Sequence, residues 1–336
     1  MTDFLVIFIK CSAIYGGLLG AAAGFTLAER KVSAWIQHRI GPNRVGPWGV
    51  LQPIADGVKF IFKEELVPDG AHRLLFRMAP LMTAIPAMLT VAVIPFAGEV
   101  SAFGITTNLS ITDLDISVLY VLAVGSLGVY GAILGGWASN SKYSLLGGLR
   151  ASAQMVSYEL SLLLCVLCVV VSAGSLDLRE IVAAQGTNPL SWYWLQHFPA
   201  FVLFVIATFA ETNRHPFDFA ECEPELVGGF HTEYSSMKFA LFFLGEYCAM
   251  TVMACLTATL FLGGFHVPFW ADAPWFVQLG AMLAKTGFFM FLFLWVRWTL
   301  PRFRFDQLMG LGWKVFLPAS LTWLFLTGAR VSLGLG

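Results

Sequence analysis

The stretch that decides the fold class is residues 160–173, which read LSLLLCVLCVVVSA and contain no charged side chain. The hydrocarbon core of a bilayer is about 30 Å thick, so a helix needs roughly 20 mostly apolar residues to cross it. Together with its flanks, from 153 to 174, this stretch is long enough, and Glu159 is its only formal charge. We therefore expect a membrane-spanning helix here.

Seven further segments have the same length and apolar character. The first, at 4–27, contains Ala21–Ala23, which resembles a signal-peptide cleavage site, but Asp3 and Lys10 and its length indicate an uncleaved span. The predicted spans are about 4–27, 75–97, 116–137, 153–174, 193–211, 238–264, 278–299 and 313–333. The sequence thus predicts an all-α fold, a polytopic transmembrane helical bundle of about eight spans that forms a single membrane domain over 1–336.

The composition of the whole chain agrees with this fold class. Of 336 residues, 57% are hydrophobic and 12% are charged, against about 45–50% and 25% in soluble domains. Disordered proteins and basic nucleic-acid binders need more polar or charged residues than this. The scattered cysteines, including Cys165 and Cys168 inside an apolar run, form no recognisable metal-binding set. We expect no nucleic acid, no metal and no redox centre in this chain.

Basic residues predict which way the bundle is oriented, because they collect on the cytoplasmic side of membrane proteins. Sixteen lie in alternate loops, at 28–74, 138–152, 212–237 and 300–312, or at the adjoining ends of spans. The opposite side has Arg179 and Arg330. We expect these loops to face the cytoplasm or matrix and both termini to lie on the outer side.

The first inner loop contains a turn-rich segment followed by an amphipathic helix. Residues 37–49 read QHRIGPNRVGPWG, and their glycines and prolines exclude a continuous helix. From 48 to 65, polar residues recur every three or four positions opposite an apolar face. A helix this polar on one face lies in the membrane interface. We expect it either to anchor the loop or to flank a lipid-facing site.

The loop at 212–237 is acidic where the orientation rule favours bases. Its acids, with the one just before it, are Glu211, Asp218, Glu221, Glu223, Glu225 and Glu233. If the segment were helical, Asp218, Glu221 and Glu225 would share one face, and mutual repulsion would raise their pKa values toward neutrality. The alternatives are a proton-exchanging cluster and a solvated acidic loop that docks on a basic partner.

Two further acids, Glu159 and Glu246, lie inside predicted spans. Carboxylates are costly in the bilayer and usually face a protein interior, so they indicate a proton or ion path, although helix-pairing acids are the simpler alternative. The residues alone leave two classes of function open. One is a proton-coupled secondary transporter, and the other is a respiratory subunit that moves protons or binds a lipid-soluble electron carrier.

Longer motifs resemble one known family. They are AERK at 28–31, RIGPNRVGP at 39–47, LQPIADGVK at 51–59, ETNR at 211–214, PFD at 216–218, ELV at 225–227, EYS at 233–235 and FALFFL at 239–244. Together with Glu221, Glu223, Glu246 and Tyr247, they resemble a membrane subunit of respiratory complex I, which is subunit 1 in mitochondria and the H subunit in bacteria. His215, Pro224 and His231 depart from the pattern expected for that family.

The resemblance implies a role in a proton-translocating NADH:quinone oxidoreductase, without a complete active site in this chain. It implies a wall of the quinone channel, with ubiquinone or menaquinone as substrate. It also implies the start of a chain of coupling carboxylates. The implied partners are quinone-site and iron–sulfur subunits of the peripheral arm, which carry FMN and the iron–sulfur clusters, and adjacent small membrane subunits.

Particular residues carry these implied roles. The quinone-channel candidates are Arg30, Asp56, Phe60, Arg214, Phe217 and Phe230. The proton-coupling candidates are Glu29, Glu159, Glu211, Asp218, Glu221, Glu223, Glu225, Glu233 and Glu246. The implied location is an energy-transducing inner membrane, bacterial rather than mitochondrial. The alternatives are a related subunit of a membrane-bound hydrogenase and a stand-alone transporter.

Overall fold

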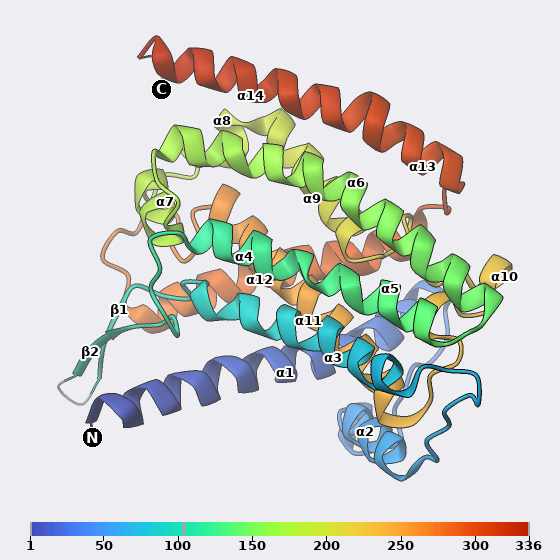
Figure 1. Cartoon of the computed structure of the whole chain (residues 1–336). Coiled ribbons are helices and arrows are strands. Elements are labelled where there is room, and N and C mark those ends of the chain that lie inside the picture. The colour runs from blue at the N-terminus through green and yellow to red at the C-terminus, as the bar shows by residue number, and fades with distance from the viewer. Residues whose placement is uncertain (1, 103–104, 335–336) are drawn as a thin grey trace.

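The computed structural model describes residues 2–102 and 105–334, and for residues 2–3, 101–102, 105–106 and 223–224 it describes the backbone alone. The described chain is a bundle of mostly long helices (Figure 1). The α-helices are α1 (Thr2–Ile36), α2 (Gln52–Phe62), α3 (Arg73–Leu89), α4 (Ser117–Ser126), α5 (Gly128–Ala138), α6 (Lys142–Ala173), α7 (Leu178–Gln185), α8 (Tyr193–Gln196), α9 (Phe198–Glu211), α10 (Glu223–Leu226), α11 (Ser236–Phe261), α12 (Trp275–Thr299), α13 (Phe305–Leu311) and α14 (Leu317–Ser332).

Shorter elements complete the chain. They are the 3₁₀ turns η1 (Pro47–Gly49), η2 (Thr90–Val93) and η3 (Gly229–His231), the π-helical η4 (Gly312–Phe316), and the strands β1 (Glu99–Ala102) and β2 (Ile105–Asn108). The strands pair antiparallel, with Val100 opposite Thr107. The membrane-protein prediction is confirmed, because seven helical segments of the described chain are long and apolar enough to cross a bilayer.

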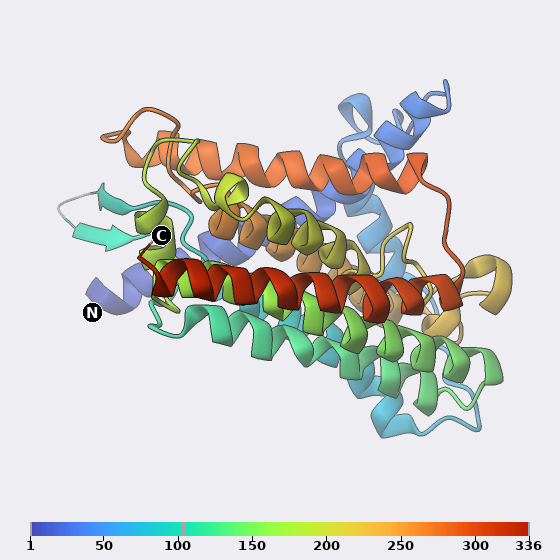
Figure 2. The same ribbon diagram turned by 90° about the horizontal axis from the view of Figure 1, so that it is seen from above.

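Both chain termini lie at the same end of the bundle (Figures 1 and 2). The β1–β2 hairpin and α7 are at that end too, whereas α2, α10 and the connection between α5 and α6 lie at the opposite end. The loops that hold most of the basic residues therefore gather at one end, as the alternation of spans requires.

The segment predicted as a span at 193–211 differs from the other spans. It consists of the short α8 and the 14-residue α9, separated by His197, whose φ of −115° and ψ of 43° are not helical. At 1.5 Å per residue, α9 is about 21 Å long, shorter than the hydrocarbon core. The prediction of a single long helix here is wrong, because Pro199 begins a new helix rather than continuing the old one.

The span predicted at 116–137 is confirmed as one apolar helical segment, Ser117–Ala138, in which α4 and α5 join at Leu127 with helical torsion angles. On α5, Gly131 allows close packing against α3, because a Cβ atom at this position would collide with Thr83. Glycine at this position therefore lets the two helices approach closely.

Several helices extend beyond their predicted ends on the side of the basic loops. Helix α1 continues to Ile36, beyond the predicted end at 27, and α6 begins at Lys142, before the predicted start at 153. In both helices the additional turns contain polar residues and lie outside the apolar stretch. The last span begins with α13 and is joined to α14 by the π-helical η4. The predicted amphipathic helix at 48–65 is confirmed as the shorter α2, with Pro53 in its first turn and an extended residue, Lys63, after it.

The expectation that Asp218, Glu221 and Glu225 share a helix face is wrong. In the described part of this loop, helix is limited to α10 and η3, and Asp218 and Glu221 precede both. Positive φ angles of 33° at Cys222 and 66° at Val227 interrupt any longer helix. The acids are instead distributed by the tertiary structure.

The main hydrophobic core lies where α6, α9 and α11 meet. Tyr158, Phe204 and Phe261 are among its largest completely buried side chains. Burying each such ring stabilises the fold by about 1.5–3 kcal/mol. This rigid centre holds the polar side chains of the neighbouring loop in place.

Candidate functional site

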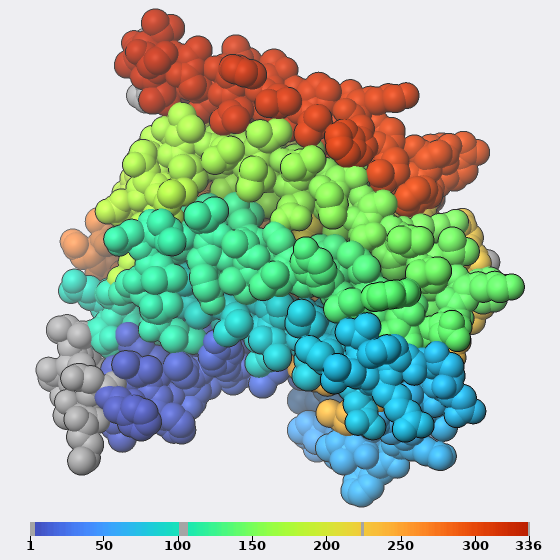
Figure 3. Space-filling model, viewed as in Figure 1, coloured from blue at the N-terminus to red at the C-terminus, as the bar shows by residue number. Residues whose placement is uncertain are grey.

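A cavity of about 490 Å³, here called the lateral cavity, lies between α1, α2 and α11. Figure 3 shows the surface hollowed between α1 and α2. Most of the lining is apolar, and its charged residues are Glu29, Arg30 and Asp56. An apolar cavity with a few convergent polar groups is typical of small-molecule sites.

The outer part of the lateral cavity is formed by α2. Phe60 lies in its lining, with its ring 6.0 Å from that of Phe239 on α11. Ser236 fixes α2 against α11, because its hydroxyl donates a hydrogen bond of 2.9 Å to the carbonyl of Phe60. Arg30 on α1 pairs with Asp56 on α2 at 2.7 Å, so this ion pair joins the two helices beside the cavity.

Glu29 stands at the protected end of the lateral cavity and has three partners. Its carboxylate lies 3.3 Å from Nη1 of Arg214 and pairs with Arg297. The hydroxyl of Tyr247 donates a hydrogen bond of 2.8 Å to the same carboxylate. Glu29 therefore lies between buried Arg214 and partly buried Arg297, so that removing its carboxylate would leave two neighbouring guanidinium groups without an acid between them.

Arg214 joins Glu29 to a second buried acid. Its Nε lies 2.6 Å from Oε1 of Glu246, and its guanidinium lies 4.8 Å from the ring centroid of Tyr247. Burial lowers the pKa of Arg214 while Glu246 and other neighbours raise it, and the net shift is upward. Arg214 therefore stays charged, and one cation balances carboxylates on two helices.

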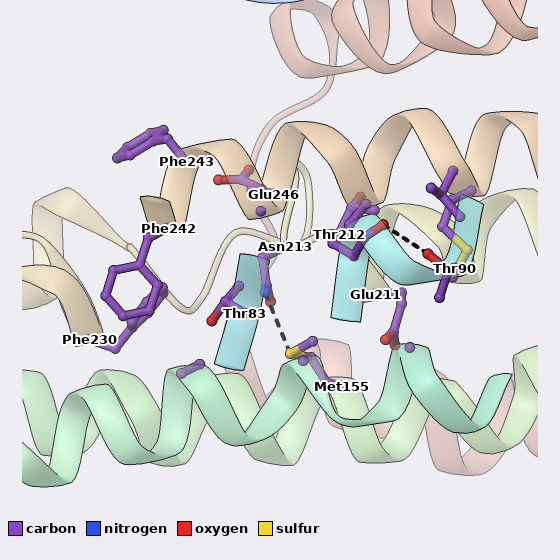
Figure 4. Close-up of a pocket in the computed structure, with 18 of the residues that line it drawn as sticks. Thr83, Thr90, Met155, Glu211, Thr212, Asn213, Phe230, Phe242, Phe243 and Glu246 are labelled. Atoms are coloured by element: carbon purple, nitrogen blue, oxygen red, sulfur yellow. Dashed lines mark hydrogen bonds between the residues drawn. The ribbon is translucent and has the colours of Figure 1, made fainter. Parts of the chain in front are cut away.

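Glu246 belongs to a second cavity, here called the central cavity, of about 110 Å³. Figure 4 shows Glu246 on α11 and Glu211, Thr212 and Asn213 at the end of α9, around the same space. Glu221 also contributes to the lining. The central cavity therefore brings together three acids from a helix, a helix end and a loop.

Among the acids of the central cavity, Glu211 has a buried carboxyl oxygen that no hydrogen bond from the described residues stabilises. This oxygen is Oε2. A buried carboxyl oxygen without a partner is costly as an anion and is normally explained by function or by water. Glu221 lies 3.8 Å from Nε2 of His231, whose pKa burial lowers to about 4, so that this imidazole is neutral near pH 7.

The other predicted proton-coupling acids are spread more widely. Glu159 on α6 hydrogen-bonds with Ser126 at the end of α4. Asp218 is buried, and one of its oxygens lies 2.9 Å from both Arg302 and His215. Asp218 therefore pairs with Arg302 and His215, and the expected repulsion between it and the other acids of the loop is not what determines its surroundings.

Glu225 and Glu233 lie outside both cavities. Glu225 is exposed and pairs with Arg150 at 2.6 Å, and the hydrogen bond from Arg150 lowers the pKa of Glu225. Glu233 is half-buried. The side chain of Glu223 lies outside the described part of the structure.

Two of the three predicted quinone-channel phenylalanines, Phe217 and Phe230, do not line the lateral cavity. Phe217 is buried and stacks on Phe303, with ring centroids 5.7 Å apart. Phe230 lines the central cavity and packs edge-to-face on Phe242. Both rings therefore support the acidic loop, whereas Arg30, Asp56 and Phe60 do meet at the lateral cavity.

Three residues that were not among the predicted site candidates belong to this network. Arg297 and Tyr247 contact Glu29, and Arg302 contacts Asp218. In the sequence analysis, Arg297 and Arg302 served only to predict the orientation of the bundle, and Tyr247 was only part of a family motif. The sequence did contain a signal for each of them. Tyr247 directly follows the intramembrane acid Glu246, and the two arginines lie at or just after the end of an apolar span. Among the described residues, no group of three or more His, Cys, Asp or Glu side chains is arranged to hold a metal ion.

Comparison with known proteins assigns the chain to a family. A family model described as NADH dehydrogenase matches residues 9–328. The H subunit of NADH-quinone oxidoreductase from Rhodospirillum rubrum is 53% identical over 325 residues, which cover 96% of this chain and 93% of the relative. The H subunit from Thermomicrobium roseum is 52% identical, and the match covers 95% of this chain and 94% of that relative. The H subunit from Vesicomyosocius okutanii is 50% identical, and the match covers 98% of this chain and 92% of that relative. The chain therefore belongs to the NADH dehydrogenase family, as a membrane subunit of the NADH-quinone oxidoreductase H type.

Proposed function

We propose that this chain forms the passage by which a quinone leaves the bilayer and reaches the reducing site of an NADH:quinone oxidoreductase. The observation that carries the proposal is the lateral cavity, which lies between a membrane-spanning helix and the amphipathic α2. An isoprenoid quinone needs an apolar path for its tail and a few polar groups for its ring, and this lining has both.

The position of α2 supports a lipid-facing entrance. Its exposed apolar side chains include Ile54, Val58, Ile61 and Phe62, which suit a helix lying in the interface. Asp56 and Lys59 lie among its polar residues and approach each other at 3.9 Å. A quinone diffusing in the bilayer would meet the apolar face before reaching the ion pair between Arg30 and Asp56.

Coupling to proton movement is the second part of the proposal. Arg214 connects Glu29, beside the lateral cavity, to Glu246, beside the central cavity. A change of charge near Glu29 alters the energy of a neighbouring charge by about 4 kcal/mol at 4 Å and an effective dielectric constant of 20. Arg214 is that neighbour, and it also pairs with Glu246, so it can pass the change from Glu29 to the acids of the central cavity.

The partners follow from the same assignment. NADH oxidation requires FMN and iron–sulfur clusters, and we propose that soluble peripheral-arm subunits carry them. The exposed side chains at the α2 end, such as Ile40 and Trp48, with Arg39 and Arg44 nearby, offer a surface for that arm. We propose that this end faces the cytoplasm of a bacterium and that both termini face outward. Because the relatives are named for a quinone acceptor, we prefer this function to a hydrogenase subunit or a stand-alone transporter.

A substitution that fills the lateral cavity tests the passage. Gly57 on α2 lines the cavity, and a Cβ atom there would have no atom within 4 Å. In the assembled complex, Gly57→Trp should lower quinone reduction by about tenfold, or about 1.4 kcal/mol, because the indole would occupy the space that the quinone needs. Electron transfer from NADH to an artificial water-soluble acceptor should be retained.

The matched control is Val58→Trp, at the next position of α2 and outside the cavity lining. It should preserve both reactions, because Val58 is exposed on the apolar side of the helix. Full quinone reduction by Gly57→Trp, or equal losses in both variants, would contradict the proposed passage.

A further inference from the structure

One aromatic side chain separates the two cavities. Among the described residues, Phe243 on α11 is the only one that lines both the lateral and the central cavity. The adjacent residues divide between them, since Phe242 lines the central cavity and Leu244 lines the lateral cavity. In Figure 4 the ring of Phe242 is directed toward Phe230, and the ring of Phe243 is directed away from it.

Neighbouring rings hold Phe243 in place. Its ring centroid lies 4.6 Å from that of Phe239 and 5.6 Å from that of His231. Phe239 lines the lateral cavity, His231 lines the central cavity, and the two rings stack 5.3 Å apart. Contacts between aromatic rings add about 0.5–1.5 kcal/mol each beyond the burial of their area. The boundary between the cavities is therefore a packed aromatic cluster of Phe239, Phe243 and His231.

Charge crosses this boundary by a different route. Arg214 lines neither cavity, yet it pairs with Glu29 of the lateral cavity and Glu246 of the central cavity. An electrostatic signal can pass through this buried guanidinium without any water crossing. An apolar constriction, in contrast, excludes water when it is narrow and closed.

We propose that Phe243 is a hydrophobic partition that keeps water and protons of the lateral cavity out of the central cavity, so that the two communicate through Arg214. Phe243 is thus a positioning residue for proton coupling. The proposal rests on the function proposed above and specifies how one cavity can bind an apolar substrate while the other holds exchangeable protons. Without the partition, the acids of the central cavity would equilibrate with the lateral cavity at any stage of turnover.

The test is the ratio of protons pumped to NADH oxidised, measured with the assembled complex in liposomes. Phe243→Ala opens the boundary and should lower this ratio about twofold or more, because a widened apolar constriction admits water. Quinone reduction is measured in parallel, and the ratio rather than the rate is the readout, because Phe243 also lines the lateral cavity. Phe243→Leu retains an apolar side chain of substantial volume and should restore most of the ratio. Phe243→Val serves as a second truncation if the alanine variant assembles poorly.

The flanking variants Phe242→Ala and Leu244→Ala are matched controls, because each removes side-chain volume from one cavity alone. Both should retain the wild-type ratio. An unchanged ratio in the Phe243 truncations would overturn the partition, as would equal decreases in all three alanine variants. A wild-type complex that reduces no quinone would instead refute the proposed function, so the two failures are distinguishable.

Discussion

The lateral and central cavities handle charge in different ways. In the lateral cavity, Arg30 pairs with Asp56 at a partly exposed position, where the side chains keep 49% and 21% of their accessible area. In the central cavity, acids lie among apolar side chains, and Glu211 has a buried oxygen without a hydrogen-bond partner. An exposed ion pair contributes little free energy, whereas an uncompensated buried charge is costly. The partly exposed pair of Arg30 and Asp56 can therefore be broken at little cost, whereas an acid of the central cavity is costly to hold as an anion without a partner.

The difference suggests a division of work between the two regions. The lateral cavity is larger, 490 Å³ against 110 Å³, and is formed partly by α1, which is long and apolar enough to cross a bilayer. Its size suits an organic substrate, while the central cavity suits protons and water. The following substitutions would break or sharpen this comparison.

The largest effect is expected from Arg214→Met, because this residue balances acids of both regions. Glu29 would keep Arg297 as a partner, but Glu246 would lose its ion pair. Removing one member of a buried pair costs about 3–5 kcal/mol. We expect little assembled complex, as measured by native electrophoresis and NADH oxidation in membranes. Adding Glu246→Gln should recover part of the assembly, and normal assembly of Arg214→Met alone would contradict the bridging role.

A smaller effect, confined to proton movement, is expected from Glu211→Gln. The substitution preserves shape and removes the exchangeable proton of a carboxyl group. Loss of a proton-transfer group commonly slows a step by about 100-fold or more, so the ratio of protons pumped to NADH oxidised should fall. Glu225→Gln is the control, since Glu225 is exposed outside the cavity. A normal ratio in Glu211→Gln would remove this acid from the path.

The smallest effect is expected from Asp56→Asn at the lateral cavity. It breaks the partly exposed ion pair with Arg30, and such pairs contribute about 0.2–1 kcal/mol. The KM for quinone should rise by no more than about fivefold, with kcat unchanged. Arg150→Gln, which breaks a comparable ion pair with Glu225 away from the cavity, should leave KM unchanged. Complete loss of activity in Asp56→Asn would show that this pair is as critical as the buried one.

Much of the fold could be predicted from the distribution of apolar residues. Segments such as 153–174 are long enough to cross a bilayer, and α6 contains all but the last residue of that range. The amphipathic pattern before Phe62 likewise predicted α2. Where proline interrupts an apolar run, length and composition were insufficient, and the break at His197 was missed.

The candidate site could be predicted only in part. Intramembrane Glu246 was identified because a carboxylate in an apolar helix is unusual. Its ion pair with Arg214 could not be read from the chain, and neither could the contact of Arg297 with Glu29, 268 positions away. The helical spacing assumed for Asp218 and Glu221 failed, because Arg302 and His215, not a helix, determine the position of Asp218.

By itself, the sequence determined that this chain consists of helices apolar enough to enter a membrane and which family its motifs resemble. These properties depend on local composition, since each apolar segment partitions into lipid largely according to its own residues. The tertiary structure alone decided that Glu29, Arg214 and Glu246 form one chain of charges and that Phe243 stands between two cavities. Such features depend on which faces of distant helices meet, and contacts between residues far apart in the chain leave no periodic signal in the sequence.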